Sequence, residues 1–201
     1  TSMNSGVSVI LYEVWANPNT AGDVWAVGEF GTVLRYDGTS WSPVSAPVTS
    51  EILWDVWGDG SGNVFIVGEI GTILKYDGTT WTSFVSPENP AYGFDTLRGV
   101  WGASATDVYV VGDSDSTAAA LHFDGSVWTY MSVTGSILYD VWGFGSDEVY
   151  AVDEAGAVFR YDGVQWTLAY EGPQWLWGIS GFTTNAVGQL HAVGDMGTIF
   201  H

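Results

Sequence analysis

Five residues that can carry a positive charge recur at a regular interval in a chain with few cations. The protein has 201 residues and only 4 Lys and Arg, against 23 Asp and Glu. The recurring positions are Arg35, Lys75, His122, Arg160 and His201. Side chains of these types could act in catalysis, bind a ligand, or pair with residues on a neighbouring strand.

An acceptor precedes each of these cations by a nearly constant number of residues. The separation is 12 residues in four copies and 15 in the third copy, which has three inserted residues. The acceptors are Asp23, Asn63, Asp107, Glu148 and Gln189. In an antiparallel hairpin this separation places the two positions opposite or diagonal to each other. The spacing therefore predicts a cross-strand ion pair or hydrogen bond in each copy, with Lys75 pairing with Asn63.

Two further sets of repeated positions combine aromatic rings with carboxylates. One set contains Tyr12, Trp54, Arg98, Tyr139 and Trp177, and the other contains Glu29, Glu69, Asp113, Glu154 and Asp195. Neutral sugars stack their C–H faces on aromatic rings, and their hydroxyls donate hydrogen bonds to carboxylates. Both sets are therefore candidate ligand-binding residues. The alternative is that the rings fill the neck of a channel and the acids help to form turns.

The third copy departs from the others and could form a unique site. It has Arg98 where the other copies have an aromatic residue, and it carries Asp113 and Asp115 in an acidic insertion. The long loop before it, residues 86–96, contains Tyr92, Phe94 and Asp95. These residues are expected on one face, where they could dock a partner. A salt bridge from Arg98 to Asp113 or Asp115 is the alternative interpretation.

All of these positions belong to a unit that occurs five times. The anchoring phrase, "LYEVWA" or "LWDVWG", begins at Leu11, Leu53, Leu97, Leu138 and Leu176. The spacings of its central residue are 42, 44, 41 and 38, close to the length of a four-stranded propeller blade, about 40 to 45 residues. The sequence predicts one domain over residues 1–201, with repeats at about 11–52, 53–96, 97–137, 138–175, and 176–201 together with 1–10.

Each unit divides into four strands separated by turn residues. In the second copy these are "LWDVW", "NVFIVG", "TILKY" and "WTSFV". A tight Glu-Ile-Gly turn joins the second strand to the third, and Asp77-Gly78 joins the third to the fourth, because such dipeptides tolerate the positive φ of a hairpin turn. No segment has a sustained helical period.

The two ends of the sequence match complementary parts of one unit. Residues 1–15 align without gaps on residues 128–142, which begin with a fourth strand, and the final "GTIFH" matches a third strand. We therefore expect an all-β fold, a five-bladed β-propeller with four antiparallel strands per blade, whose last blade is closed by the N-terminal strand. A segment of a longer array would give the same pattern.

Two tryptophan positions vary too little between copies to indicate recognition. They are Trp15, Trp57, Trp101 and Trp142 in the innermost strands, and Trp41, Trp81, Trp128 and Trp166 after the Asp-Gly turns. We expect them to pack between blades. The whole unit, "DVWG…VGE.GTIL.YDG..W", resembles the tandem propeller repeats of secreted bacterial proteins, in the style of Asp-box and lectin-like propellers. That resemblance implies a binding module, but a fold does not fix a function.

The composition argues against several classes of partner. The formal net charge of -19 repels phosphate backbones and anionic membrane surfaces, so we expect neither nucleic acid nor membrane insertion. The chain has no cysteine, which excludes disulfides and thiolate metal sites. No basic and apolar leader or long apolar run is present. We expect a secreted, periplasmic or cell-surface setting.

Cofactor and metal signals are weak. "DGSGN" at residues 59–63 places oxygen-bearing side chains at alternate positions, as in calcium loops, but it lacks the glycine at the sixth position and the glutamate at the twelfth. A plain turn is the preferred interpretation, so we expect no cofactor and no dedicated metal site.

Catalytic signals are also weak. His122 and His201 belong to the repeated cation positions, His191 lies within a strand, and no nucleophile elbow or phosphate loop occurs. We expect a non-catalytic protein that recognises carbohydrate at several equivalent sites and gains strength from multivalency. The alternative is a scaffold for protein interaction or adhesion, and a glycoside hydrolase is the third hypothesis.

Overall fold

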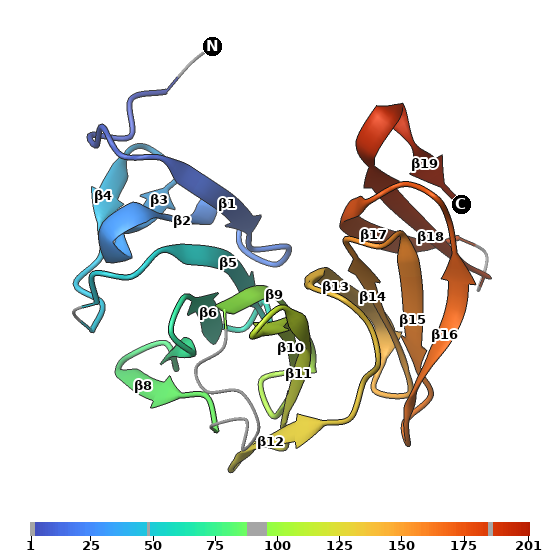
Figure 1. The fold of residues 1–201 in the computed structure, drawn as a ribbon. Coiled ribbons are helices and arrows are strands. Elements are labelled where there is room, and N and C mark those ends of the chain that lie inside the picture. The colour runs from blue at the N-terminus through green and yellow to red at the C-terminus, as the bar shows by residue number, and fades with distance from the viewer. Residues whose placement is uncertain (1–2, 48, 88–95, 185–186) are drawn as a thin grey trace.

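The computed structural model describes residues 3–47, 49–87, 96–184 and 187–201, and in these ranges the chain folds into five antiparallel sheets. The sheets follow one another around a central channel as the blades of a β-propeller (Figure 1). The first four blades have four strands each and the fifth has three. This confirms the predicted five-bladed β-propeller.

Within each blade the strands follow in chain order from the channel outward. The first blade contains β1 (Leu11–Ala16), β2 (Asp23–Gly28), β3 (Val33–Asp37) and β4 (Trp41–Pro43). The second contains β5 (Leu53–Gly58), β6 (Val64–Gly68), β7 (Thr72–Tyr76) and β8 (Trp81–Val85). The third contains β9 (Thr96–Ser104), β10 (Asp107–Ser114), β11 (Thr117–Phe123) and β12 (Trp128–Met131). The fourth contains β13 (Leu138–Gly145), β14 (Glu148–Asp153), β15 (Ala157–Tyr161) and β16 (Trp166–Glu171). The fifth contains β17 (Leu176–Thr184), β18 (Val187–Gly194) and β19 (Ile199–Phe200). Short 3-10 turns, η1 (Glu29–Gly31) and η2 (Asp195–Gly197), link the second and third strands of the first and fifth blades.

The Asp-Gly turns form as predicted. The glycines have φ between 90° and 93° at Gly38, Gly78, Gly125 and Gly163, a backbone region that residues with a Cβ rarely adopt. In the second blade the Asp77 carboxylate accepts the backbone N–H groups of Thr79 and Thr80, at 2.9 and 2.7 Å. These hydrogen bonds lower the pKa of Asp77. The carboxylate thus accepts the backbone hydrogen bonds that hold the turn, as in an Asx-turn.

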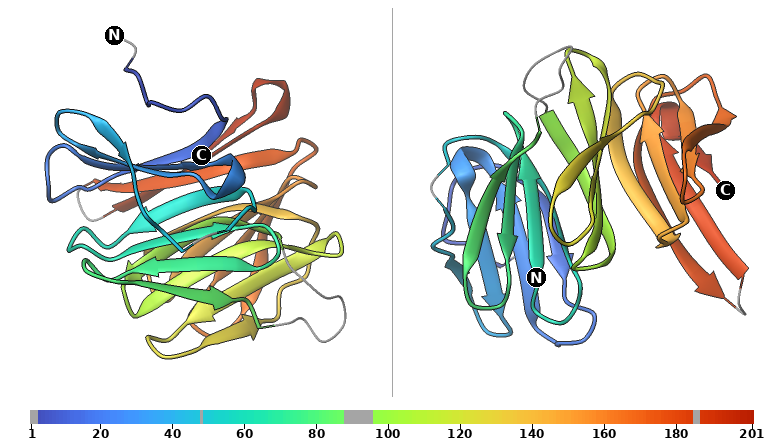
Figure 2. Two further views of the ribbon diagram at one scale, coloured as in Figure 1. Left: turned by 90° about the vertical axis from the view of Figure 1, so that its left-hand side faces the viewer. Right: turned by 90° about the horizontal axis from the view of Figure 1, so that it is seen from below.

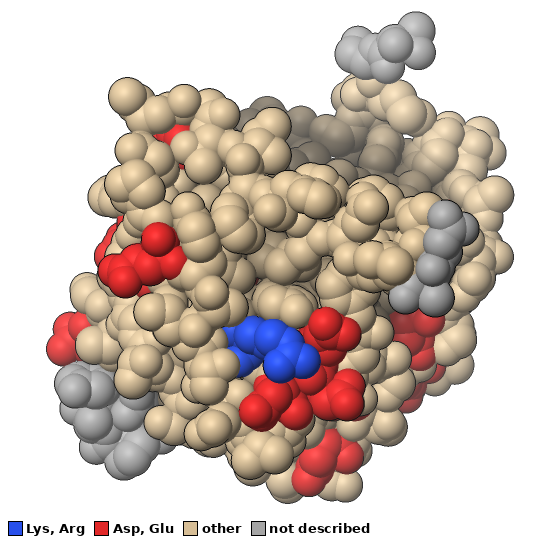
Figure 3. All heavy atoms as spheres, turned by 90° about the vertical axis from the view of Figure 1, so that its right-hand side faces the viewer, with Lys and Arg blue, Asp and Glu red and all other residues tan. Residues whose placement is uncertain are grey.

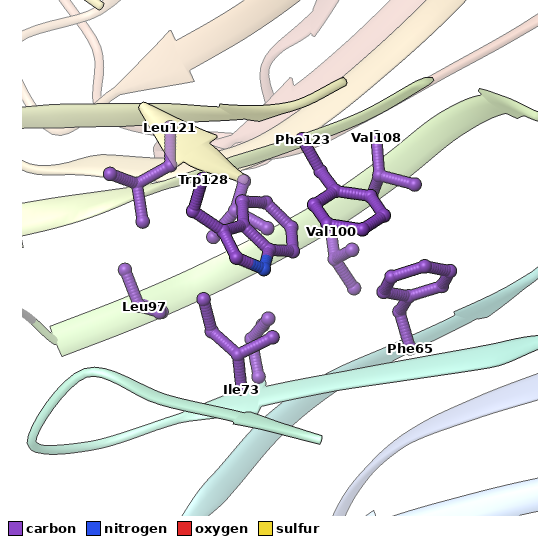
Figure 4. Close-up of a cluster of buried hydrophobic side chains, with 10 residues drawn as sticks. Phe65, Ile73, Leu97, Val100, Val108, Leu121, Phe123 and Trp128 are labelled. Carbon is purple, nitrogen blue, oxygen red and sulfur yellow. The ribbon is translucent and has the colours of Figure 1, made fainter. Parts of the chain in front are cut away.

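The core lies between blades, because each sheet is apolar on both faces. We call the face toward the following blade the forward face and the opposite one the rear face. Figure 4 shows one junction, where Phe65 and Ile73 from the forward face of the second blade point toward Leu97, Phe123 and Trp128 of the third. Three further clusters of this kind fill the other junctions.

A contact between a tryptophan of one blade and a glycine of the next sets the spacing of neighbouring blades. The ring of Trp57 lies so close to Gly102 that a Cβ there would be 2.6 Å from a ring carbon. The same contact occurs between Trp15 and Gly58, Trp101 and Gly143, and Trp142 and Gly181. The innermost tryptophans therefore pack between blades, as their sequence pattern predicted.

The first and fifth blades do not close on each other as expected. Figure 1 shows the five blades as an arc with an opening between the first and the fifth, and Figure 2 shows the same blades from two sides. The expected N-terminal strand is not found: residues 3–10 contain no strand, and β19 pairs only with β18. Ile10 is instead tied to the first blade, because its backbone N–H donates to Glu29 and its carbonyl accepts from the Glu29 N–H.

Candidate binding face at the channel mouth

The innermost strands of all five blades line a cavity of about 960 Å³ at the centre of the arc. All five candidates of the aromatic set lie on its wall: Tyr12, Trp54, Arg98, Tyr139 and Trp177. Each is the second residue of its repeated phrase, so the common register of the innermost strands brings residues from far apart in the sequence to one end of the channel.

These five side chains form one continuous arc. The rings of Tyr12 and Trp54 are 4.5 Å apart between centroids, and those of Tyr139 and Trp177 are 4.6 Å apart. The Arg98 guanidinium lies between the two pairs, 5.7 Å from the ring of Trp54 and 5.1 Å from that of Tyr139. These separations suit cation–π attraction. The rings therefore pack on one another instead of forming five separate platforms.

The acidic candidates have different partners in different blades. Asp113 accepts from Arg98 at 2.8 Å, which is one of the two salt bridges that the alternative interpretation of the third copy named. Asp195 accepts from the indole N–H of Trp177 at 2.7 Å. Glu29 accepts the backbone N–H of Ile10 at 3.0 Å, and Glu154 accepts from the Ser136 hydroxyl at 2.5 Å. The aromatic and acidic sets thus meet directly in the third and fifth blades.

Two acidic positions need separate comment. Glu69 lies in the turn after β6, where its backbone N–H donates to Ile52. Asp113 was expected in a tight turn but belongs to β10, because the three inserted residues lengthen the hairpin and move the turn to Asp115 and Ser116. The candidates Tyr92, Phe94 and Asp95 lie outside the described residues.

Apolar side chains project from the turns that border this end of the channel. Phe30, Ile70 and Met196 each follow the turn acid, have φ between 53° and 59°, and are exposed. A bulky residue at positive φ costs conformational energy. In the fifth blade Trp175 is also exposed and lies 5.4 Å from Trp177. Exposed apolar groups therefore lie beside the turn carboxylates in the first, second and fifth blades.

Carboxylates deeper in the channel were missed by the sequence analysis. Asp55 accepts the backbone N–H of Val100 in the next blade at 2.7 Å, and Asp140 accepts that of Ile179 at 2.8 Å. Burial raises the pKa of Asp55, and burial raises the pKa of Asp140 to about 7. The signal was the third residue of the repeated phrase, which is either an acid or a glycine: Glu13, Asp55, Gly99, Asp140 and Gly178.

The repeated cations form the predicted cross-strand pair in the first and third blades and not in the second. The predicted contacts form between Arg35 and Asp23 at 2.7 Å and between His122 and Asp107 at 2.6 Å. Lys75 does not pair with Asn63, whose side chain donates to Asp59 instead. The directly opposite residue on the neighbouring strand is aromatic in four blades: Trp25, Phe65, Tyr109 and Tyr150. Lys75 accordingly lies over Phe65, 5.2 Å from its centroid, and over Phe123 at 4.9 Å.

The remaining signals from the sequence are local. Asp59 of the "DGSGN" segment accepts hydrogen bonds from Ser61 and Asn63, the pattern of a turn stabilised by its own side chains.

Across the residues that the structure describes, no helix is long and apolar enough to span a membrane. Figure 3 shows one face on which separate acidic clusters, one of them beside basic residues, interrupt a mostly uncharged surface.

These features define a β-propeller with an aromatic and acidic channel mouth, and comparisons with known proteins support the fold. No family model matches the chain, and no curated protein matches it. Among solved structures, an ancestral GH74 enzyme matches with a TM-score of 0.71 and 17% identity, over 96% of this chain. This chain spans only 28% of the length of that enzyme.

Two YCF48 structures are also similar. YCF48 from Cyanidioschyzon merolae matches with a TM-score of 0.69 and 14% identity, over 98% of this chain and 70% of that one. YCF48 bound to D1 peptide matches with a TM-score of 0.52 and 13% identity, over 95% of this chain and 77% of that one. At these identities the likeness establishes the propeller fold and leaves function to the site itself.

Proposed function

We propose that this protein is a non-catalytic binding propeller whose channel mouth holds an extended, basic and apolar segment of another protein. The observation that carries this proposal is the continuous arc from Tyr12 to Trp177 with Arg98 at its centre. Aromatic residues and arginine are the side chains that most often dominate the energy of protein interfaces. An arc, unlike five separate sites, suits an elongated ligand.

The surroundings of the arc support a ligand of this chemistry. The exposed side chains of Phe30, Ile70 and Met196 offer apolar contacts at the rim. The carboxylates beside them, and a net charge of -19, favour a basic partner and speed its approach. One of the similar structures is itself a propeller bound to a peptide, which agrees with this use of the fold without demonstrating it here.

A panel of fluorescent peptides tests the proposal. Peptides that alternate Lys or Arg with Leu or Phe should bind, scrambled acidic peptides should not, and affinity should fall as salt is raised. Phe30→Ser and Ile70→Ser should weaken binding several-fold without changing stability, because both side chains are exposed. Val164→Ser is the matched control, since Val164 is even more exposed than Phe30 and Ile70 but lies in the Asp-Gly turn of the fourth blade. Equal binding by all three variants would contradict the proposal.

Carbohydrate recognition is the second candidate and is favoured by one place in the fifth blade. Trp175 and Trp177 are exposed side by side, and Asp195 is hydrogen-bonded to the Trp177 indole. A sugar could stack on these rings. The acids of the other blades have different partners, so one site is favoured over the five equivalent sites expected from the sequence. A glycan array at millimolar calcium, with and without chelator, tests it: Trp175→Ala should abolish any signal from this place.

A hydrolase is the least supported candidate. The two carboxylates with raised pKa, Asp55 and Asp140, both accept backbone N–H groups of a neighbouring blade. That arrangement gives them a structural role. Turnover of a glycoside panel that is lost on changing Asp55 or Asp140 would favour an enzyme. We propose that no such turnover occurs.

We also propose that the protein works in a secreted or surface-exposed setting.

A further inference from the structure

The junction between the first and second blades contains a cavity of about 610 Å³. The loop from Thr20 to Gly22 and the turn at Thr79 border it, so it lies at the end of the blades opposite the β2–β3 turn and the channel mouth. Among the described residues it shares no lining residue with the cavity at the channel mouth. Its size is within the range of small-molecule sites, about 300 to 1,000 Å³. The cavity is therefore a candidate site separate from the arc around Arg98.

A small side chain in the first blade accounts for this space. Val44 follows Trp41 by three residues, and the same position holds Phe84 in the second blade and Met131 in the third. Phe84 packs against Phe123 across the second junction, at 6.1 Å between ring centroids, and Met131 packs into the third junction. Because valine is shorter than either side chain, the first junction keeps a space that is filled at the next two.

The cation at this junction also leaves an aromatic wall uncovered. At the second junction Lys75 reaches across to the next blade and lies 4.9 Å from the ring of Phe123. Arg35 instead lies over Trp25 of its own blade, 5.0 Å from the ring centroid. Tyr76, the residue equivalent to Phe123, therefore lines the cavity with a partly exposed ring.

We propose that this cavity binds a short neutral saccharide, which stacks on Tyr76 and Trp81 and hydrogen-bonds to the ion pair of Arg35 and Asp23. The two rings are 5.0 Å apart between centroids, and both are partly exposed. The C–H faces of a sugar pack on rings of this kind. A sugar hydroxyl both donates and accepts, so a guanidinium beside a carboxylate can satisfy both of its roles.

The polar groups of the cavity can reach a ligand. The bond between Arg35 and Asp23 uses the Nε of the arginine at 2.7 Å, and 45% of the Arg35 side chain is exposed. Its terminal amino groups can therefore donate to a hydroxyl. The exposed side chains of Ser42, Ser45 and Asp37 also line the cavity. Donors and acceptors thus lie beside the aromatic wall.

Other classes of ligand suit the cavity less well. The carboxylates of Asp23 and Asp37, together with the net charge of -19, repel an anion. The rings of Trp25, Tyr76 and Trp81 lie 5.0 to 6.0 Å from one another, so they form a wall and not a cage that encloses a cation. A wholly apolar ligand would desolvate the ion pair without new hydrogen bonds. A neutral ligand with hydroxyls avoids all three costs.

Saturation-transfer NMR tests the proposal with a panel of neutral disaccharides of glucose, galactose, mannose, xylose and N-acetylglucosamine. Val44→Phe places in the first junction the ring that Phe84 supplies in the second. It should weaken binding at least about tenfold without lowering the Tm. Val164→Phe is the matched control, because Val164 is exposed in the Asp-Gly turn of the fourth blade. This variant should bind the sugar as the original protein does.

A second pair of variants tests the ion pair. Arg35→Met keeps a stem over Trp25 but removes the donors, and it should weaken binding several-fold. Lys75→Met, the same change in the second blade, should leave binding unchanged. Trp175→Ala should also leave it unchanged, which separates this cavity from the fifth blade.

Three outcomes would overturn the proposal. The first is that no sugar of the panel binds, and the second is that Val44→Phe binds as well as the original protein. The third is that choline or a uronic acid binds in place of the neutral sugars and is lost in Val44→Phe, since the cavity would then be a site for a charged ligand.

Discussion

Single residues in this protein often serve the fold where their repetition suggests chemistry. The repeated cations lie opposite aromatic residues in four blades, and Arg35 and His122 also reach the acids predicted for them. Lys75 spans two blades, because Phe65 belongs to the second and Phe123 to the third. The apolar stem of a lysine packs on such rings while its charge is attracted to their faces.

Lys75 should therefore be replaceable by an apolar residue of the same length. Lys75→Met keeps the packing on Phe65 and Phe123 and should change the free energy of unfolding by less than about 0.5 kcal/mol. Lys75→Ala removes that packing and should cost about 1 kcal/mol or more. Urea unfolding followed by tryptophan fluorescence measures both. A large loss in Lys75→Met would mean that the charge itself is required.

At the scale of elements, blades are joined by a small set of repeated contacts. The innermost tryptophan of one blade lies on a glycine of the next, and Asp55 and Asp140 accept backbone N–H groups across a junction. These contacts fix the distance between neighbouring sheets and their relative position along the channel. Tryptophans and carboxylates that resemble binding residues in the sequence therefore have a structural role.

The glycine under each tryptophan should be intolerant of any side chain. In Gly102→Ala the new Cβ would lie 2.6 Å from the ring of Trp57, so the blades must separate at a cost of about 1 to 3 kcal/mol. Ala16→Gly is the control, because position 16 is equivalent but has no tryptophan over it. Thermal unfolding should show a lower Tm for the first variant and little change for the second. A neutral Gly102→Ala would show that the junctions are loosely packed.

The partly buried carboxylate of Asp140, at the fourth junction, predicts a pH dependence of stability. The pKa of Asp140 is about 7 in the folded protein and 3.8 without its surroundings. The folded state thus binds more protons between these values, so this group's stabilising effect is present below about pH 4 and is lost as the pH rises through about 7. The Tm should fall between about pH 4 and about pH 7, and Asp140→Asn should flatten that fall. In Asp162→Asn the slope should be unchanged, because hydrogen bonds lower the pKa of Asp162 and move its titration to more acidic pH.

At the scale of the whole molecule, the repeated strands could be predicted from the sequence. The features that depend on how several blades assemble could not. The third and fourth strands of the second blade were predicted to the residue, because Asp77-Gly78 and the apolar pattern define them locally. The closure of the ring could not be predicted in this way, because it depends on the angle between blades, which is set by packing at four junctions together. The same holds for the arc around Arg98, since Trp54 and Tyr139 meet that side chain only after three blades have assembled.

Two valines at the same position of the repeat test whether the ring is open in solution. Val56 is buried against the first blade, so Val56→Asp places an unpaired charge in a junction and should unfold the protein or cost several kcal/mol, about 3 or more. Val14 faces the opening, so Val14→Asp should cost less than about 0.5 kcal/mol. The two variants have the same chemistry at equivalent positions of the repeat, and a blade precedes only Val56. Chemical unfolding of both gives the comparison directly: equal losses would mean that Val14 is covered in solution, and the ring would then not be open at this face.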